Sequence, residues 1–268
     1  MIMFCCSLMA VRAQSNCSIE NTAFRSGEFL TYDLYFHWKL VWVKVGIGNM
    51  STVMSTYDGK PAYRTTLTTG GNSKLDGIFT MRDTLLSYCG LSDLAPLYYR
   101  KGAKEGKRYY VDQLWYSYPN GKTHVKIHRV NHKGKRTDDE QDFNECIYDM
   151  MSIFMKARNF DASTMKKGDI LPMPIMDGKK MTDSWLLYRG TDTFTMEGNK
   201  KEKFRCLVFS FYERDKKKNK KHELIRFYVT DDKNHLPVRL DMNLSFGTAK
   251  AYLRSYQGVR NEMTSIIK

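Results

Sequence analysis

Residues 27–55, GEFLTYDLYFHWKLVWVKVGIGNMSTVMS, decide the fold, because this stretch predicts two long β-strands in succession. From Leu30 onward every second residue is apolar, and a period of two is typical of a strand with one face against a core. That face is expected to hold Leu30, Tyr32, Leu34, Phe36, Trp38 and Leu40. The second strand has valines in step from Val41 and contains Gly46 and Gly48, where a strand can bend or bulge.

The same strand–turn–strand pattern continues along the chain. Asp58-Gly59, Asn120-Gly121 and Asp177-Gly178 are two-residue hairpin signals, because both central positions of such turns require positive φ. Repeated hairpins predict a mostly β protein with a strongly curved or barrel-like antiparallel sheet. Residues 14–268 are expected to form a single domain, or two β subdomains joined near the helical segment 143–168.

The period changes in NECIYDMMSIFMKARNF, where a helix is expected at about residues 144–159 and packed on the sheet. Asp142 or Asn144 would cap its start. Its apolar positions, at helical spacing, are Ile147, Met150, Met151, Phe154 and Met155. We expect this face to pack on the aromatic face of the opening hairpin, or to contact a ligand, since methionine adapts to irregular apolar shapes.

Charge and composition restrict the function only broadly. The 268 residues carry a formal net charge of +14, which permits attraction to nucleic acid, anionic lipid or acidic glycans without choosing among them. The segment Arg214 to Lys221 is basic and is interpreted as a solvated hairpin tip. No stretch is apolar over the length that a transmembrane helix requires.

The N-terminus predicts export. Residues 1–13, MIMFCCSLMAVRA, combine an apolar run with a small-residue cleavage site and resemble a signal peptide. The expected location is therefore the periplasm or cell envelope of a Gram-negative bacterium, without nucleic acid as a partner. In such a compartment Cys17, Cys89, Cys146 and Cys206 can form two disulfides, and their spacing leaves three pairings open.

Motifs that would identify a reaction are absent from the sequence. There is no GxSxG, HExxH, phosphate-binding loop or dinucleotide-binding glycine pattern. His124, His128 and His132 would share one face of a helix, but the alternation around Ile127 predicts a strand. On a strand the outer two lie about 27 Å apart, too far for one metal ion. We expect no metal and no cofactor.

Several short motifs, in this order, resemble the bacterial envelope family known as domain of unknown function 3108, in its Bacteroidetes-like form. They are Gly27-Glu28 with Tyr32; Asp83 with Ser87 and Leu94 to Pro96; Asp149, Ser152 and Arg158; and Thr230-Asp231 with Leu236-Pro237-Val238 before Gly247. The resemblance spans most of the chain after residue 13. It implies an exported, mostly β protein and brings no catalytic residues with it.

The leading functional hypothesis is a non-enzymatic envelope protein that binds a hydrophobic or amphipathic ligand, or an envelope partner, in the concavity of the sheet. The candidate ligand-binding residues are Trp38, Trp42, Met151, Phe154 and Met155. Each is also a natural core residue. Asp149, Ser152 and Arg158 are interpreted first as structural polar residues of the helix and second as site residues.

Two alternatives remain open at this stage. The first is an envelope hydrolase acting on glycan or peptide, with Asp83 and Asp149 as candidate acids. The second is an assembly protein whose core is filled and holds no ligand. A cavity beneath the helix would favour the carrier, and a polar cleft with converging carboxylates would favour the enzyme.

Overall fold

The fold is one continuous antiparallel sheet of sixteen strands among the described residues, with a short helix inside its curve. The structure is a computed structural model. It describes residues 17–38, 41–71, 81–105, 107–178, 180–196, 201–215, 219–244 and 247–268. The predicted signal peptide, residues 1–13, lies outside the described part.

The first half of the sheet is a run of hairpins whose order in space follows the sequence. Its strands are β1 (Glu28–Trp38), β2 (Val41–Tyr57), β3 (Lys60–Gly71), β4 (Met81–Gly90), β5 (Pro96–Glu105), β6 (Arg108–Ser117), β7 (Thr123–Val130) and β8 (Arg136–Phe143), with a 3₁₀ turn at Pro119–Gly121.

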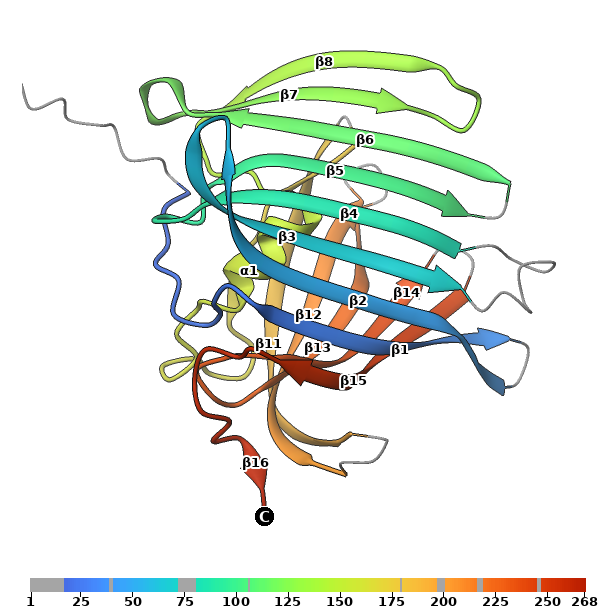
Figure 1. The fold of residues 1–268 in the computed structure, drawn as a ribbon, viewed down its shortest axis with the longest axis vertical. Coiled ribbons are helices and arrows are strands. Elements are labelled where there is room, and N and C mark those ends of the chain that lie inside the picture. Colours follow the sequence, from blue (N-terminus) through green and yellow to red (C-terminus); the bar gives the residue numbers. More distant parts are fainter. Residues whose placement is uncertain are drawn as a thin grey trace, which may run out of the picture.

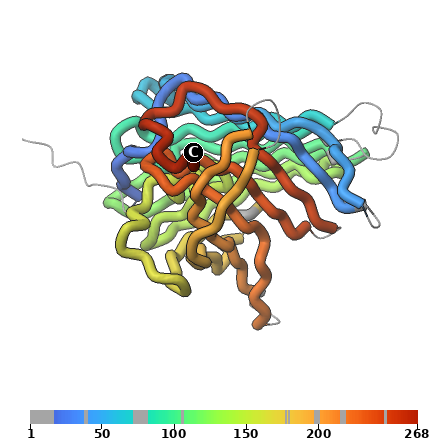
Figure 2. The backbone as a smooth tube through the Cα atoms, turned by 90° about the horizontal axis from the view of Figure 1, so that it is seen from below, coloured from blue at the N-terminus to red at the C-terminus, as the bar shows by residue number. Residues whose placement is uncertain are grey.

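The second half follows the helix α1 (Met150–Ala157). Its strands are β9 (Ile170–Pro172), β10 (Ile175–Asp177), β11 (Lys180–Thr195), β12 (Lys203–Asp215), β13 (Lys220–Thr230), β14 (Pro237–Leu244), β15 (Gly247–Gln257) and β16 (Ile266–Ile267). β15 pairs with β1, so the chain's last long strand joins its first and both halves belong to one sheet. The two halves form facing walls, with the yellow segment that contains α1 at one end (Figures 1 and 2).

The two predicted strands of the opening hairpin are present. The predicted Asp58-Gly59 turn, which joins β2 to the next strand, is also present. β1 pairs with β2 from Glu28↔Thr52 to Trp38↔Val41. β2 and β3 are joined by Asp58 and Gly59, whose φ angles are 47° and 70°. Positive φ at both positions gives the turn the twist that the flanking strands need.

The predicted helix is shorter than expected. α1 spans Met150–Ala157 rather than 144–159, and Asp149 is its N-cap instead of Asp142 or Asn144. Ile147 and Tyr148 are apolar at helical spacing but are not helical. Tyr148 instead forms a bridge to Ile175, and it accepts and donates backbone hydrogen bonds with the β10 segment.

The helix also does not primarily cover the opening hairpin, which corrects that expectation. Its main contacts are with β4 and β10. Met151 joins the large core between the two walls, whereas Met155 packs with Ala23 and Phe24 of the segment that precedes β1. The helix therefore fills one end of the curve.

One disulfide is formed among the described cysteines, not two. Cys17 and Cys146 are bonded across 129 residues, while Cys89 and Cys206 are buried free thiols. The bond fixes the segment before β1, residues 17–27, to the segment that leads into α1. Closing so long a loop stabilises the folded state by restricting the unfolded chain.

This pairing predicts a selective labelling pattern. Alkylation of the denatured, unreduced protein should modify Cys89 and Cys206 and leave Cys17 and Cys146 unlabelled, because only the first two are thiols. Peptide mass spectrometry after digestion measures this directly. Labelling at Cys17, or protection of Cys89, would contradict the assignment.

Candidate functional site

Two groups of buried polar side chains lie at the two ends of α1. At its C-terminal end, Arg158 and Glu28 form an ion pair whose two side chains are each 1% exposed. Nη1 and Nη2 of Arg158 bind Oε1 and Oε2 of Glu28 at 2.5 and 2.9 Å. Two parallel charge-assisted bonds fix both the distance and the orientation of the pair.

The remaining donors of Arg158 are also used. Nε and Nη2 donate to the carbonyl of Asn234 at 3.2 and 3.1 Å, and the guanidinium lies 5.5 Å from the ring of Phe24. Burial alone would lower the pKa of Arg158, but the Glu28 carboxylate outweighs burial and raises it. The arginine is therefore a permanently charged cross-link between β1, α1 and the β13–β14 turn.

Further hydrogen bonds extend this cross-link to both ends of the described chain. Nδ2 of Asn234 donates to the carbonyl of Asn261, whose N–H returns a bond to Oδ1 of Asn234. Asn159, next to Arg158, accepts from the N–H groups of Thr22 and Ala23. The segment before β1, the end of α1 and the segment after β15 thus meet at one place.

A second buried group lies at the N-terminal end of α1. The Oδ1 atom of Asp149 accepts from the N–H groups of Met151 and Ser152, each at 2.8 Å. Oγ of Ser152 accepts from the N–H of Asp149, and Oγ of Ser87 on β4 donates to Oδ2 at 3.4 Å. This is a capping box tied to the sheet, which satisfies the free donors of the first helical turn.

Burial disfavours the ionised forms of the acidic groups near this cap. Burial raises the pKa of Asp149 to about 6, against the lowering effect of its hydrogen bonds from Ser152, Met151 and Ser87. Burial also raises the pKa of Cys89 and of Tyr116. A thiol with a raised pKa is a poor nucleophile, so Cys89 is a core residue by this criterion.

The candidate acids of the hydrolase hypothesis are not brought together. Ser87 contacts Asp149, and Asp83 precedes Ser87 by four residues on the same strand. At about 3.4 Å per residue Asp83 lies about 14 Å along β4 from Ser87, the residue that contacts Asp149, whereas the carboxylates of a glycoside hydrolase pair lie within about 10 Å. Asp83 instead accepts a hydrogen bond from the N–H of Lys104 on β5.

The candidate ligand-binding residues lie in three different surroundings. Met151 and Met155 are buried in separate clusters, and Phe154 is half-buried with its ring 6.5 Å from that of Phe227. Trp42 lies on β2 at the end of the sheet away from α1, with its side chain exposed. The side chain of Trp38 lies outside the described part. The four described side chains of this set therefore do not share one site.

Two of the three histidines follow the strand prediction. His124 and His128 lie on β7 and pair across the sheet with Asp142 at 2.8 Å and Asp138 at 2.6 Å on β8. His132 lies beyond the strand, with its ring 5.8 Å from that of Tyr110. The described residues contain no group of three or more histidine, cysteine or acidic side chains placed to hold a metal ion.

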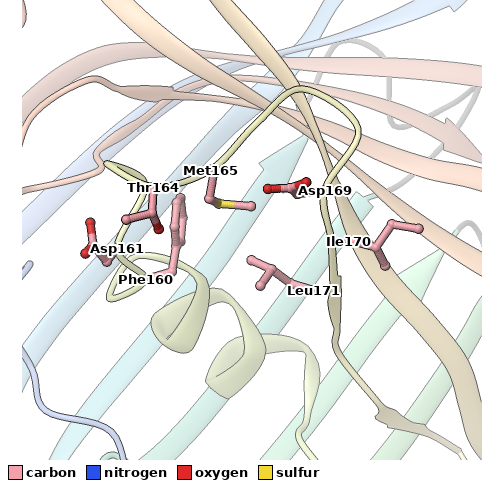
Figure 3. A pocket seen from close by; sticks show the side chains of 7 residues that line it. All are labelled: Phe160, Asp161, Thr164, Met165, Asp169, Ile170 and Leu171. Carbon is pink, nitrogen blue, oxygen red and sulfur yellow. The ribbon is translucent and has the colours of Figure 1, made fainter.

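Two open depressions mark the surface. The first, about 410 Å³, follows the loop after α1 and is lined by Phe160, Asp161, Thr164, Met165, Asp169, Ile170 and Leu171 (Figure 3). The second, about 590 Å³, lies over β2 and β3 around Gly46 and Gly70. Both are open to solvent, and neither is an enclosed cavity under the helix.

Sequence reasoning missed Glu28 and Asn234 as partners of Arg158. Glu28 is acidic but lies in step with the apolar residues Leu30 and Tyr32 of β1, and a buried acid in such a position needs a charged partner. The pairing itself spans 130 residues and could not be found from spacing.

The buried pair predicts an asymmetric response to mutation. Glu28→Gln should lower the free energy of unfolding by about 3–5 kcal/mol, because it leaves the Arg158 charge buried without its partner. The double variant Glu28→Leu with Arg158→Met should recover most of that loss, since neither charge then remains. Urea unfolding followed by circular dichroism measures both.

The exposed pair of Arg214 and Asp183, 3.4 Å apart and each 42% exposed, is the control. Asp183→Asn should change stability by less than about 1 kcal/mol. Equal effects of Glu28→Gln and Asp183→Asn would contradict the role given to the buried pair.

The raised pKa of Asp149 predicts a pH dependence. Because the folded state holds this proton more tightly than the unfolded state, the stability from this group is full below about pH 4 and is lost as the pH rises through 6. Asp149→Asn keeps an N-cap side chain but cannot titrate. The stability of the wild type relative to this variant should therefore fall by roughly 1–3 kcal/mol between about pH 4 and pH 7. A difference that is constant over this range would refute the assignment.

Comparison with known proteins is consistent with this fold. A search of the curated proteins found no match. A solved structure described as a beta-barrel-like protein of domain of unknown function DUF1849 from Brucella abortus is similar, with a TM-score of 0.55 and 10% sequence identity, over 91% of this chain and 100% of that chain. At this identity the likeness concerns the fold alone.

The sequence also matches the family described as "Protein of unknown function (DUF3108)" over residues 31–254. The buried contacts explain why the short motifs of the resemblance occur together. Tyr32 donates to the carbonyl of Pro237 at 2.9 Å, and Ser87 binds Asp149, so motifs distant in sequence meet around α1. On this match the chain belongs to the DUF3108 family.

Proposed function

We propose that this protein is an exported, non-enzymatic protein of the cell envelope that binds an apolar or amphipathic ligand on the inner face of its curved sheet. The observation that carries the proposal is a set of half-buried apolar side chains on strands away from α1. They pack against the core but are not fully covered: Leu34, Leu67, Leu240 and Met242.

Strand register places these side chains in adjoining rows. Leu34 lies opposite Ala251 on β15, which lies opposite Leu240 on β14. Met50 lies opposite Leu67, which lies opposite Leu85. Side chains aligned across neighbouring strands share one face, so each row forms an apolar stripe across three strands.

Small residues keep this surface accessible. Gly48 lies beside Leu34, and a Cβ atom at this glycine would stand 3.6 Å from Cδ2 of Leu34. Leu34 lies opposite Gly46 on β2 and Ala251 on β15, so neither of its cross-strand partners has a large side chain. An acyl chain or similar apolar group could contact the surface here, and covering it would gain about 25 cal/mol per Å².

Export is supported by the disulfide and by the N-terminal sequence. A bond such as that between Cys17 and Cys146 persists in oxidising compartments and is rare in the cytosol. Residues 1–13 have the composition of a signal peptide. Among the described residues, no helix has the length and apolar character needed to cross a membrane.

An assembly role is the second candidate. The interior around α1 is filled by side chains, and the two depressions are open. This hypothesis predicts that the protein is recovered without a ligand and that the apolar rows are covered by a protein partner.

The test is native mass spectrometry of the protein purified from envelopes, together with titration by a fluorescent apolar probe. Leu34→Glu and Leu240→Glu should each weaken probe binding by about tenfold, because a charge is placed in the apolar rows. Ile170→Glu is the control, since Ile170 is 57% exposed on β9.

The proposal is supported if the wild type retains a small molecule and both Leu34→Glu and Leu240→Glu lose it. Absence of any retained molecule, with probe binding that Leu34→Glu and Ile170→Glu reduce equally, would contradict it.

A further inference from the structure

We infer that the end of the sheet opposite α1 binds an anionic lipid surface through the apolar tips of two neighbouring hairpins. By tips we mean the described strand residues beside the two turns, which are Val41 and Trp42 at the start of β2 and Leu244 at the end of β14. The β1–β2 and β14–β15 hairpins are adjacent because β1 pairs with β15, and Phe36 lies opposite Ala249. This inference does not require a ligand on the inner face and can fail independently of the proposed function.

The described residues of these tips are unusually apolar and exposed. Val41 is 58% exposed, Trp42 40% and Leu244 39%. All three are paired strand residues at the ends of their strands, where apolar side chains that gather in the open are costly unless a partner covers them. Three large apolar side chains at adjacent tips therefore indicate a partner that is itself apolar.

Two lysines and a histidine lie near the tips. Nζ of Lys250 lies 4.3 Å from the centre of the Trp42 ring, and the ring of His37 lies 5.0 Å from it on the β1 side. Lys44 also lies near the tip, although its ammonium is paired with Asp33 at 2.7 Å. A tryptophan accompanied by lysine is suited to the boundary between lipid headgroups and acyl chains.

The neighbouring turns at this end add positive charge and an exposed aromatic ring. The β5–β6 turn presents Lys107, Arg108 and Tyr109, and the β7–β8 turn presents Lys133 and Lys135, all exposed. In Figure 1 these turns lie at the right-hand end of the strands, with the tip of β1, while α1 lies toward the other end. Several lysines and arginines on one end of a chain with net charge +14 attract an anionic surface.

The combination of residues distinguishes lipid from other anionic partners. A nucleic acid or an acidic protein would use the cations but would leave Val41 and Leu244 in water. A bilayer uses both, because the apolar tips enter the interface while the cations remain among the headgroups. The surface is thus suited to peripheral docking, in which the end of the sheet opposite α1 faces the lipid.

The test is cosedimentation of the full chain with vesicles of phosphatidylglycerol and phosphatidylcholine, compared with vesicles of phosphatidylcholine alone. Binding should require the anionic lipid and weaken with salt. Val41→Asp and Leu244→Asp should each reduce it by about tenfold. Ile170→Asp is the matched control, because Ile170 is as exposed as Val41 but lies on β9.

Brominated lipids give a direct readout of insertion. Trp38 pairs with Val41 at the same end, so the measurement is made in a Trp38→Phe background. Tryptophan fluorescence should be quenched there, and most of that quenching should disappear when Trp42→Phe, which keeps an aromatic ring at the tip, is added. Circular dichroism of every variant establishes that it is folded. Equal loss of binding in Ile170→Asp and Val41→Asp, unchanged quenching in Trp42→Phe, or no binding to anionic vesicles would overturn the inference.

Discussion

The ion pair between Glu28 and Arg158 is the constraint on which the rest of the structure depends. Neither side chain is accessible to water, so neither charge can persist unless the first strand and the end of α1 come together. The carbonyl of Asn234 then uses the remaining donors of the guanidinium and brings in the β13–β14 turn. One arginine thereby sets the positions of three segments that lie far apart in the sequence.

The motifs that identify the family have a structural explanation in these contacts. Glu28, Arg158, Asp149, Ser152 and Ser87 are buried and bind one another or the backbone. The Thr230 hydroxyl accepts from the N–H of Leu236, which fixes the turn before β14. Polar residues in such positions are required to satisfy the interior, and none of them converges on an accessible cleft as a catalytic group would.

Local chemistry predicted much of the fold, and long-range contacts account for what it missed. Alternation in β1 and the Asp58-Gly59 turn depend on neighbouring residues, and both predictions were correct. The helix was predicted too long because Ile147 stands at helical spacing from Met150 and Met151, whereas the next residue, Tyr148, forms a bridge to Ile175. The partner of Arg158 and the pairing of Cys17 depend on contacts more than 100 residues away, and the exposure of Trp42 depends on where the hairpin lies in the sheet.

The two ends of the sheet thus have different roles: the α1 end is held by buried polar contacts, and the opposite end presents apolar tips and cations. Hydrogen–deuterium exchange of the protein alone measures this division. Amides of α1 and of the first residues of β1 should exchange together and slowest, while those at the tips of the β1–β2 and β14–β15 hairpins should exchange orders of magnitude faster. Exchange of α1 as fast as that of the tips would contradict the account.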